Sequence, residues 1–467
     1  MADYDLIVIG AGPGGYVAAI RGAQKGLRVA IVEKENAGGC CLNRGCVPTK
    51  SLMHAAHLYR EIKHGEKFGI STQGAEIDLN KLYENKNNTV ATLRGGIEQL
   101  FKANKVNLFK GTAAITGENS VKIYSDESIT LTANNILIAT GGKPQTLPGN
   151  LAQTDGIYTS DHILGDNPVD LKRIVIIGAG VIALEFASFY SDMGCEVSVV
   201  ARSSVLKKMD REISQNLTMI MKKRGVRFET NADIKNIEKT AGGLKCVFEQ
   251  KEKELVIECD GVIAAMGRTA NTDGLFEGFE SIETDRGAIV VNENNQTNVA
   301  NIYAIGDCTK GSIQLAHVAS AEGMNVISHI IGEHAAVDMN TVPSCIYTDP
   351  EIATVGLSAD EAKEKGISVK TGKYVMNGNA KTLLSGQERS FMKVVFDAET
   401  DKIIGAQLMC TRATDMISEF VGAISQGASA HELSGIIRPH PTFVEGITEA
   451  VEDVLGLAIH IAPKVKL

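Results

Sequence analysis

The stretch that decides the fold reads Asp5-Leu6-Ile7-Val8-Ile9-Gly10-Ala11-Gly12-Pro13-Gly14-Gly15 and lies close to the N-terminus. Its first five residues form a short apolar run, as expected of a strand that is buried on both faces. Helical spacing follows from Gly14 to Lys25, and a second apolar run covers Arg28 to Val32. The order of strand, glycine-rich turn, helix and strand predicts a βαβ unit that binds a dinucleotide.

The glycines of this turn and the acid that follows it suit that ligand. Gly10 permits a tight turn, Gly12 lets a pyrophosphate approach the backbone, and Gly15 lets helix and strand pack closely. Gly14 belongs to the same turn, where the N-terminus of the helix faces the phosphates. Glu33 ends the second strand, where a carboxylate can accept hydrogen bonds from an adenosine ribose.

A second unit repeats the pattern without a gap, since residues 10–33 align with residues 178–201. Arg173 to Ile177 predicts a strand, Val181 to Met193 a helix, and Cys195 to Val200 another strand. The turn is Gly178-Ala179-Gly180-Val181-Ile182-Ala183, in which Ala183 replaces the third glycine. Two dinucleotide sites in one chain suggest one bound flavin and one exchangeable nicotinamide.

The second unit differs from the first in charge. The position that matches Glu33 is Ala201, and the residues that follow it include Arg202, Lys207 and Lys208. No carboxylate is available for a ribose 2′-hydroxyl, whereas cationic side chains can hold a 2′-phosphate. We therefore predict a preference for NADP(H) over NAD(H). A solvated basic turn is the alternative.

Composition places these units in a large cytoplasmic enzyme. The 467 residues predict about three domains, with two or four as alternatives, at roughly 100–200 residues per domain. The net charge of −9 argues against a nucleic-acid binder. No window approaches the run of about 18 apolar residues that a membrane span needs. The N-terminus lacks signal-peptide features, and nine cysteines do not indicate a secreted disulfide framework.

A cysteine pair follows the first unit, in Gly39-Cys40-Cys41-Leu42-Asn43-Arg44-Gly45-Cys46-Val47-Pro48-Thr49-Lys50. If a helix begins near Cys46, its first turn can meet the preceding loop and close a disulfide with Cys41. A helix N-terminus and a flavin would both favour a thiolate on Cys46. A metal pair and two buried thiols are alternatives, although no second Cys/His pair lies at zinc spacing. Cys40 is a competitor for pairing.

These motifs together resemble the FAD-dependent pyridine nucleotide–disulfide oxidoreductases, over essentially the whole chain. The resemblance implies an α/β fold with two Rossmann-like dinucleotide-binding domains, for FAD and NAD(P), plus a C-terminal α+β dimerisation domain. The segments that carry it are the Gly10 and Gly178 turns, the Cys41–Cys46 motif, Ala139-Thr140-Gly141, Met266-Gly267-Arg268-Thr269-Ala270-Asn271-Thr272, Tyr303-Ala304-Ile305-Gly306-Asp307 and His440-Pro441-Thr442.

On this basis we divide the chain into four predicted domains. They are an FAD-binding domain (1–149), an NAD(P)-binding domain (150–270), a central domain that completes the FAD site (271–342) and a C-terminal interface domain (343–467). Linkers are expected at Gly142 to Gly149 and at Gly267 to Asp273, which are rich in turn-forming residues. In the last domain, helical patterns at Ala413 to Gln426 and Thr442 to Leu457 follow strand patterns.

The resemblance also implies how the redox centre is arranged. Cys46 would be the thiol nearest the flavin, and Cys41 would exchange with the substrate. Lys50 would lie near flavin N5 and pair with Glu185, because a cation there stabilises negative charge on the reduced ring. Asp307 would hydrogen-bond the ribityl chain of FAD. By the same resemblance the other predicted cofactor contacts are Thr140, Gly141, Gly267, Ala316 and, at the nicotinamide site, Gly178, Gly180, Ala183, Arg202 and Lys208.

Thiol exchange needs a base, and the resemblance assigns that role to His440. Histidine titrates near neutral pH, and a carboxylate such as Glu445 can fix its tautomer. The implied site takes His440 from the partner subunit, so we expect a homodimer.

Within this family the chain most resembles the members that oxidise dihydrolipoamide. The implied reaction passes electrons from a dihydrolipoyl group through the disulfide and a tightly bound, non-covalent FAD to NAD(P)+. The implied partner is a lipoylated carrier protein of a 2-oxoacid dehydrogenase or glycine cleavage system. The Arg202 region instead resembles NADPH-dependent glutathione reductases, which keeps a disulfide reductase as an alternative. A structural subunit of a complex and a flavin oxidase without a redox disulfide are weaker alternatives.

Overall fold

The computed structural model describes residues 2–149, 151, 154–387 and 389–462. The chain forms two compact units. The first unit comprises Met1–Ile174, Ile237–Lys245 and Glu258–Met339, and the second comprises Val175–Asn236, Cys246–Ile257 and Asn340–Leu467.

A seven-stranded sheet organises the first unit. Its strand order is β3-β2-β1-β6-β5-β4, and β19 also pairs with β6. The pairs β1–β2, β2–β3, β1–β6 and β6–β19 are parallel, whereas β5 pairs antiparallel with both β4 and β6. The strands are β1 (Tyr4–Ile9), β2 (Val29–Glu33), β3 (Asn107–Lys110), β4 (Thr112–Gly117), β5 (Ser120–Tyr124), β6 (Ile129–Ile138) and β19 (Ile302–Ala304).

Both faces of the central strand β1 are covered, as the apolar run predicts. Ile7 and Ile9 pack into one hydrophobic cluster, whereas Leu6 and Val8 pack into another. All four side chains are buried. Their alternation follows from the two-residue period of a strand, and a strand buried on both faces is typical of a parallel sheet.

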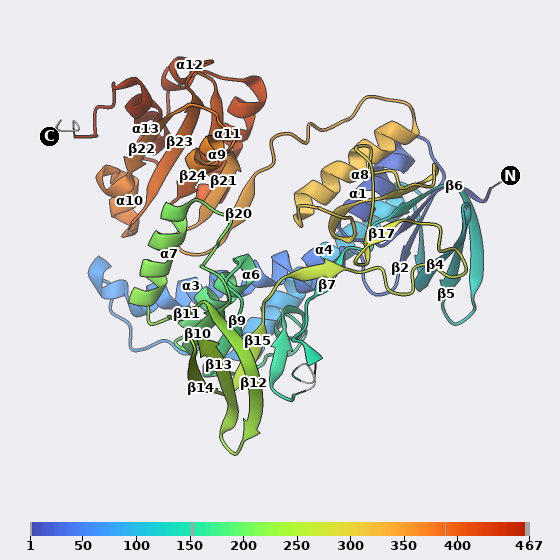
Figure 1. The fold of residues 1–467 in the computed structure, drawn as a ribbon, viewed down its shortest axis with the longest axis horizontal. Helices are drawn as coiled ribbons and strands as arrows, with labels where there is room; N and C mark the ends of the chain where they lie inside the picture. The colour runs from blue at the N-terminus through green and yellow to red at the C-terminus, as the bar shows by residue number, and fades with distance from the viewer. Residues whose placement is uncertain (1, 150, 152–153, 388, 463–467) are drawn as a thin grey trace. The chain divides into compact units, whose positions relative to one another are not determined.

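Helices α1 and α8 lie side by side in the first unit (Figure 1). Their approach is close, because a Cβ atom on Gly323 would lie 2.7 Å from the Gly14 carbonyl oxygen. The predicted helix from Gly14 is confirmed, with α1 beginning one residue earlier. The helices of this unit are α1 (Pro13–Gln24), α2 (Gly39–Arg44), α3 (Cys46–Lys63), η1 (Gly65–Phe68), α4 (Leu79–Ala103), α5 (Ser160–Ile163), η3 (Gly306–Cys308) and α8 (Ala316–Ile330).

The two predicted linkers pair with each other as short strands. Strands β7 (Gly142–Pro144) and β16 (Arg268–Ala270) form an antiparallel ribbon in which Ala270 lies opposite Gly142. Four further strands belong to the first unit: β8 (Ile157–Thr159), β15 (Gly261–Ala264), β17 (Thr284–Asp285) and β18 (Ala288–Ile289). Three more have residues in both units: β12 (Ala232–Thr240), β13 (Gly243–Gln250) and β14 (Lys253–Cys259).

The second βαβ unit is confirmed within one residue at each end. It consists of β9 (Arg173–Ile177), α6 (Val181–Asp192) and β10 (Glu196–Ala201). α7 (Arg211–Lys223) follows and leads to β11 (Arg227–Thr230), which pairs in parallel with β10.

The C-terminal part of the second unit is an antiparallel sheet with helices packed against it. Its order is β20-β21-β24-β23-β22. The predicted helix Ala413–Gln426 is confirmed as α11, whereas α13 covers only Glu445–Leu455 of the predicted range. Gly456 takes a left-handed conformation, which ends α13 early. The other elements are β20 (Ser344–Ile346), β21 (Ile352–Gly356), α9 (Ala359–Glu364), β22 (Val369–Val375), η4 (Met376–Gly378), α10 (Ala380–Ser385), β23 (Phe391–Asp397), β24 (Ile403–Met409) and α12 (Ala430–Ser434).

Two parallel βαβ units and a C-terminal α+β sheet are the α/β architecture that the sequence predicts. The four predicted domains divide the chain more finely than the two compact units do, and they stay a prediction. Among the described residues, no helix is both long enough and apolar enough to cross a membrane.

Candidate redox-active site

The glycine turn after β1 has the close contacts that its sequence predicts. Gly10 has φ +101°, and a Cβ atom there would lie 2.4 Å from the Ala139 carbonyl oxygen. A Cβ atom on Gly15 would lie 1.9 Å from the Gly10 carbonyl oxygen. Gly12 differs, because a Cβ atom there would have the Gly39 Cα as its nearest neighbour, at 3.9 Å. The fold itself thus requires Gly10 and Gly15, whereas Gly12 borders open space that suits a pyrophosphate.

Glu33 is buried at the end of β2 and contacts the glycine turn directly. Its Oε2 accepts a hydrogen bond of 2.8 Å from the Ala11 backbone N–H, and its Oε1 accepts one of 2.8 Å from Glu35. The carboxylate therefore fixes the turn, which is a role that sequence reasoning missed. Its predicted contact with a ribose stays a prediction.

Cys41 and Cys46 form a disulfide with a Cα–Cα distance of 4.7 Å. The predicted helix begins at Cys46, as α3. The expectation that Cys41 lies in a loop is wrong, because it lies in the short helix α2. Gly45 joins the two helices, and a Cβ atom there would lie 2.9 Å from the Cys40 carbonyl oxygen. The absence of a side chain at Gly45 lets the helices approach closely enough for the disulfide.

Asn43 fastens α2 from inside the cysteine motif. Its Nδ2 donates to the Gly39 carbonyl oxygen at 2.8 Å and to that of Ala37 at 3.0 Å. Its Oδ1 accepts a hydrogen bond of 2.8 Å from Arg94 on α4. The sequence held no local signal for this contact, because Arg94 is 51 residues away.

Cys40 does not take part in the disulfide. Its Sγ donates to the Arg44 carbonyl oxygen at 3.8 Å. Burial raises the pKa of the Cys40 thiol, and the charge of Arg268 only partly opposes this effect. A protonated thiol is a weak nucleophile, so Cys40 is poorly suited to compete in exchange. Among the described residues, no three histidine, cysteine or acidic side chains are grouped as metal ligands.

A chain of charges runs from the cysteine motif to Asp307. Arg44 lies 3.7 Å from Asp161, Asp161 lies 3.8 Å from Arg268, and Arg268 lies 4.0 Å from Asp307. Burial raises the pKa of Asp307, although the charge of Arg268 opposes the shift. The sequence pointed to Asp307 but not to the charges that join it to the redox motif.

The predicted flavin contacts gather at the carboxyl ends of parallel strands. Thr140 and Gly141 follow β6, Gly10 follows β1, and Asp307 follows β19. Asn271 holds this edge, since its backbone N–H donates to the Gly141 carbonyl oxygen at 2.9 Å. The Thr140 hydroxyl is buried without a hydrogen-bond partner among the described residues. An orphaned hydroxyl beside the open Gly12 turn fits a bound dinucleotide.

The second glycine turn is open in the same way. Gly178 has φ +126°, and a Cβ atom on Gly180 would meet no heavy atom within 4 Å. Ala183 is buried in the first turn of α6. Past the end of β10, the Arg202 side chain is 78% exposed and lies 3.8 Å from Asp233. Lys207 and Lys208 are exposed as well.

Lys50 and Glu185 lie in different compact units. Lys50 is on the first turns of α3, four residues after Cys46, so the two side chains share a face of that helix. Glu185 is buried on α6 and accepts a hydrogen bond of 3.1 Å from the Tyr347 backbone N–H. The predicted pairing of Lys50 with Glu185 stays a prediction.

His440 and Glu445 form the predicted pair in the second unit. His440 Nδ1 lies 2.8 Å from Glu445 Oε1, and Glu445 Oε2 accepts a hydrogen bond of 2.8 Å from the Thr442 N–H. Burial favours a higher pKa for Glu445, but the bonds from Thr442 and His440 outweigh it and lower the pKa. The ionised carboxylate holds Nδ1 of His440, so Nε2 is the nitrogen that can exchange a proton with another group. The His440 side chain is 72% exposed.

The structure thus gathers the predicted residues in two sets. The disulfide lies with the first glycine turn, and the imidazole–carboxylate pair lies with the second. The first set is Gly10, Gly12, Gly14, Gly15, Glu33, Cys41, Cys46, Lys50, Thr140, Gly141, Gly267, Asp307 and Ala316. The second set is Gly178, Gly180, Ala183, Glu185, Arg202, Lys208, His440 and Glu445.

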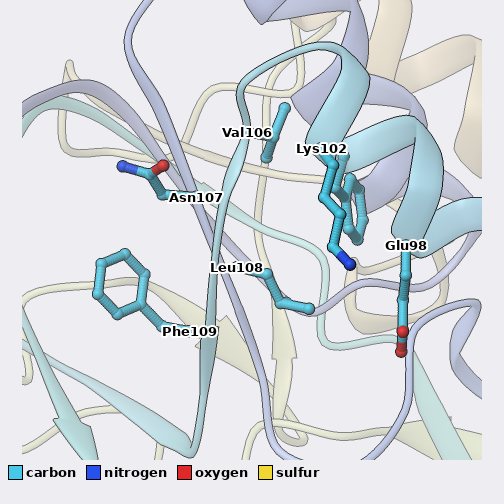
Figure 2. A pocket seen from close by; sticks show the side chains of 7 residues that line it. Glu98, Lys102, Val106, Asn107, Leu108 and Phe109 are labelled. Atoms are coloured by element: carbon cyan, nitrogen blue, oxygen red, sulfur yellow. The ribbon is translucent and has the colours of Figure 1, made fainter.

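A surface hollow in the first unit contains none of these residues. Figure 2 shows that it lies at the end of α4 and beside β3, with both apolar and charged side chains around it. Its lining is Glu98, Phe101, Lys102, Val106, Asn107, Leu108 and Phe109. It holds no group suited to the predicted redox chemistry.

Comparison with known families decides the identity of this fold and site. Residues 4–323 match the model of the pyridine nucleotide-disulphide oxidoreductases, and residues 342–451 match the dimerisation domain of the same family. The chain belongs to this family. It is therefore an oxidoreductase whose chemistry uses FAD and a nicotinamide dinucleotide, with a C-terminal dimerisation domain that supports a homodimer.

The similarity to characterised relatives covers nearly the whole chain. A dihydrolipoyl dehydrogenase of Staphylococcus aureus is 39% identical, with 98% of both chains covered. One of Bacillus subtilis is 37% identical, with 98% of this chain and 99% of the relative covered. One of Geobacillus stearothermophilus is 39% identical, with 99% and 98% covered.

Two solved structures share the fold. LpdA from Mycobacterium tuberculosis has a TM-score of 0.88 at 26% identity and covers 96% of this chain and 99% of its own. The HOCl-induced flavoprotein disulfide reductase RclA from Escherichia coli has a TM-score of 0.85 at 25% identity, with 96% and 99% covered.

Proposed function

We propose that this protein oxidises dihydrolipoamide, carried by a lipoylated protein, to lipoamide with reduction of NAD(P)+. The observation that carries the proposal is the Cys41–Cys46 disulfide, placed at the start of α3 and beside the Gly12 turn. Relatives named dihydrolipoyl dehydrogenase, at 37–39% identity over nearly the whole length, support the substrate. The carrier would belong to a 2-oxoacid dehydrogenase or glycine cleavage system, in the cytoplasm.

The first half of the reaction is an exchange between two pairs of sulfurs. A thiolate of the substrate attacks Cys41 Sγ, which breaks the Cys41–Cys46 bond and leaves a thiolate on Cys46. The second substrate thiol then displaces Cys41, which closes the lipoyl disulfide and leaves both cysteines reduced. Two electrons and two protons pass from substrate to enzyme. The Gly12 turn would hold FAD, which would supply a two-electron relay between this dithiol and the nicotinamide.

His440 of the partner subunit would serve the exchange as acid and base. The bond from Glu445 to Nδ1 leaves Nε2 available to take a proton from the substrate thiol. The same proton is then available for Cys41 when that thiolate leaves. The disulfide and the imidazole lie in different compact units. The proposal brings them together in the homodimer that the dimerisation domain supports.

The remaining assignments concern the cofactors. Gly10, Gly12 and Gly15, with Glu33 and Asp307, would hold FAD, and Lys50 would place its cation near the flavin ring. We propose that the second turn prefers NADP(H), because exposed Arg202, Lys207 and Lys208 follow β10. An NADPH-dependent disulfide reductase, similar to glutathione reductase, is a second candidate that this same charge supports.

Steady-state kinetics of the purified flavoprotein test both candidates. The assay compares dihydrolipoamide oxidation with reduction of glutathione disulfide, each with NAD(H) and with NADP(H). We expect kcat/KM for dihydrolipoamide to exceed that for glutathione by at least about 100-fold, since a disulfide site discriminates by its substrate contacts. A preference for glutathione with NADPH would overturn the first candidate and establish the second.

A further inference from the structure

The His440 loop, residues 435–444, connects α12 to α13 and turns one charged side chain inward. Residues 435–437 and 439–441 are exposed, whereas the Arg438 side chain is only 3% exposed. Among the described residues, the backbone groups of residues 437–441 make no hydrogen bond to other backbone groups. The path of the loop, and with it the place of the His440 imidazole, therefore depends on side-chain contacts.

The guanidinium of Arg438 is bound from three helices of the second unit. Nη2 donates to Glu419 Oε1 on α11. Nη1 donates to Thr448 Oγ1 on α13 at 2.8 Å and to the Leu433 carbonyl oxygen on α12 at 3.3 Å. A planar guanidinium offers its N–H donors in fixed directions, so contacts on both of its outer nitrogens define its orientation. Arg438 thus joins the His440 loop to three helices at once.

The charge of Arg438 makes this anchor strict. Glu419, its carboxylate partner, is 29% exposed, so the ion pair is partly buried. Leu433 lies in the last turn of α12, where carbonyl groups without a partner in the helix favour a cation. A guanidinium that loses such partners leaves a buried charge unpaired, which is strongly destabilising. The loop is therefore confined to positions that keep Arg438 in place.

Contacts after His440 fix the loop from its other side. Asn379 Nδ2 donates to the Thr442 carbonyl oxygen at 2.9 Å, and the Thr442 N–H donates to Glu445 Oε2 at 2.8 Å. Asn379 is itself buried, and its side chain caps α10. His440 thus lies between the anchor at Arg438 and the anchors at Asn379 and Glu445.

We propose that Arg438 is a positioning residue for the exchange base, holding the backbone two residues before His440 so that Nε2 meets the exchanging sulfurs in a fixed geometry. Proton transfer requires its two partners to lie within hydrogen-bond reach. Glu445 sets the tautomer of the imidazole, whereas Arg438 sets where the imidazole stands. The inference rests on the proposed role of His440 as the base and adds a residue that acts only through it.

The test measures how fast a dithiol reduces the holoenzyme, followed by flavin absorbance in anaerobic stopped flow. Dihydrolipoamide and dithiothreitol are the two probes. We expect Arg438→Gln to lower this rate by about 10- to 100-fold, since a misplacement of about 1 Å costs about that much. Electron transfer from NAD(P)H to ferricyanide uses no thiol proton, so the same variant should keep that rate within about twofold of wild type. Equal loss of both rates would show a merely structural role and would overturn the proposal.

A double-mutant cycle decides whether Arg438 acts through His440. His440→Gln removes the base, and in that background we expect Arg438→Gln to lower the remaining rate of reduction by less than about twofold. Equal factors in the two backgrounds would mean that Arg438 acts independently of His440, and that result would overturn the proposal.

Two milder variants decide the question if Arg438→Gln does not fold. Arg438→Lys keeps the charge beside Glu419 but loses the planar fork, and Thr448→Val removes one acceptor outside the loop. We expect each to lower the rate of reduction by about three- to tenfold. Arg412→Gln, at an arginine of the same unit that is 68% exposed, serves as the matched control and should match wild type. Wild-type rates in both milder variants would overturn the proposal.

The two probes separate this inference from the proposed function. If dithiothreitol reduces the wild-type enzyme and dihydrolipoamide does not, the proposed substrate is refuted, and the Arg438 variants still give an answer with dithiothreitol. If His440→Gln reacts as fast as wild type with both probes, His440 is not the exchange base, and the role of Arg438 is refuted with it.

Discussion

Gly39, the first residue of α2, packs directly against Gly12 of the dinucleotide turn: a Cβ atom on Gly39 would lie 2.5 Å from the Gly12 Cα. Gly39 also has φ +58°, which disfavours any side chain. The helix that carries Cys41 therefore begins on the backbone of the predicted pyrophosphate site. This contact places the helix that carries Cys41 next to the glycine turn within the first unit.

Substitution of Gly12 and of Gly39 is expected to separate cofactor binding from folding. Gly12 has φ −70° and ψ −178°, which suit alanine, and its Cβ would enter the open space of the turn. We expect Gly12→Ala to leave the melting temperature of the apoprotein nearly unchanged but to weaken FAD binding by at least about tenfold. Flavin fluorescence titration of the apoprotein measures the affinity.

Gly39→Ala is the matched comparison, since both its conformation and its contact oppose a side chain. We expect the apoprotein itself to melt at lower temperature, because a strained backbone costs about 1–3 kcal/mol. Wild-type affinity for FAD in Gly12→Ala would show that the pyrophosphate does not approach this turn.

The three cysteines of the motif should differ sharply in function. We expect Cys41→Ser and Cys46→Ser to lower the rate of dihydrolipoamide oxidation by at least about 1,000-fold, because either change removes the exchanging disulfide. Cys40→Ser should stay within about twofold of wild type, since burial keeps the Cys40 thiol protonated and hydrogen-bonded to Arg44. Activity is read as NAD(P)H formation.

A thiol count in denaturant provides the structural control for these variants. Reduction should release two additional thiols in wild type and in Cys40→Ser, but none from this motif in the other two variants. Loss of the disulfide in Cys40→Ser would contradict the pairing of Cys41 with Cys46.

Much of the fold was readable because it depends on local patterns. The apolar run of β1, the glycine turns and the helical period of α11 all lie within short stretches of sequence. The pair His440 and Glu445 was predicted from the family resemblance, through a motif that is also local, since five positions separate the two residues. Residues that are close in sequence thus supplied both the strands and the core of the site.

Contacts between distant segments were not readable in this way. Arg94 fastens Asn43 from α4, and Asp161 lies between Arg44 and Arg268, yet nothing in their local sequence marks them. The ribbon of β7 and β16 joins segments about 130 residues apart that were expected to be plain linkers. Glycine and threonine in a stretch indicate a turn, but only the fold decides which stretch lies beside it.

Buried Lys86 on α4 is expected to make stability depend on pH in the alkaline range. Its ammonium donates to the Leu164 carbonyl oxygen at 3.0 Å and also to that of Gly165, at the end of α5. Burial lowers the pKa of Lys86 to about 8, from an unfolded value of 10.5. Between pH 8 and pH 10.5 the unfolded chain binds more protons than the folded protein does, so the free energy of unfolding rises with pH.

The comparison is between wild type and Lys86→Met, by melting temperature from pH 8 to 10. We expect the free energy of unfolding of wild type to rise, relative to that of the variant, by up to a few kcal/mol as pH rises. The reason is that a difference of one pKa unit corresponds to about 1.4 kcal/mol. Lys81→Met, at an exposed position of the same helix, should show no such divergence. Parallel curves for wild type and Lys86→Met would exclude a lowered pKa.

Arg202 is expected to determine the preference of the enzyme for NADP(H) over NAD(H). It is exposed just after β10, one residue past Ala201, which matches Glu33 of the first unit, and it lies 3.8 Å from Asp233. A guanidinium there binds a 2′-phosphate, whereas a carboxylate binds a 2′-hydroxyl and repels the phosphate.

We therefore expect Arg202→Glu to lower the ratio of kcat/KM for NADP(H) over NAD(H) by about 10- to 100-fold. Arg286→Glu changes an arginine of the first unit that is also highly exposed, and it should leave the ratio unchanged. Asp233→Asn should shift the ratio modestly toward NADP(H), because it releases the guanidinium from its carboxylate. A ratio that stays constant in Arg202→Glu would mean that the basic turn is only a solvated surface.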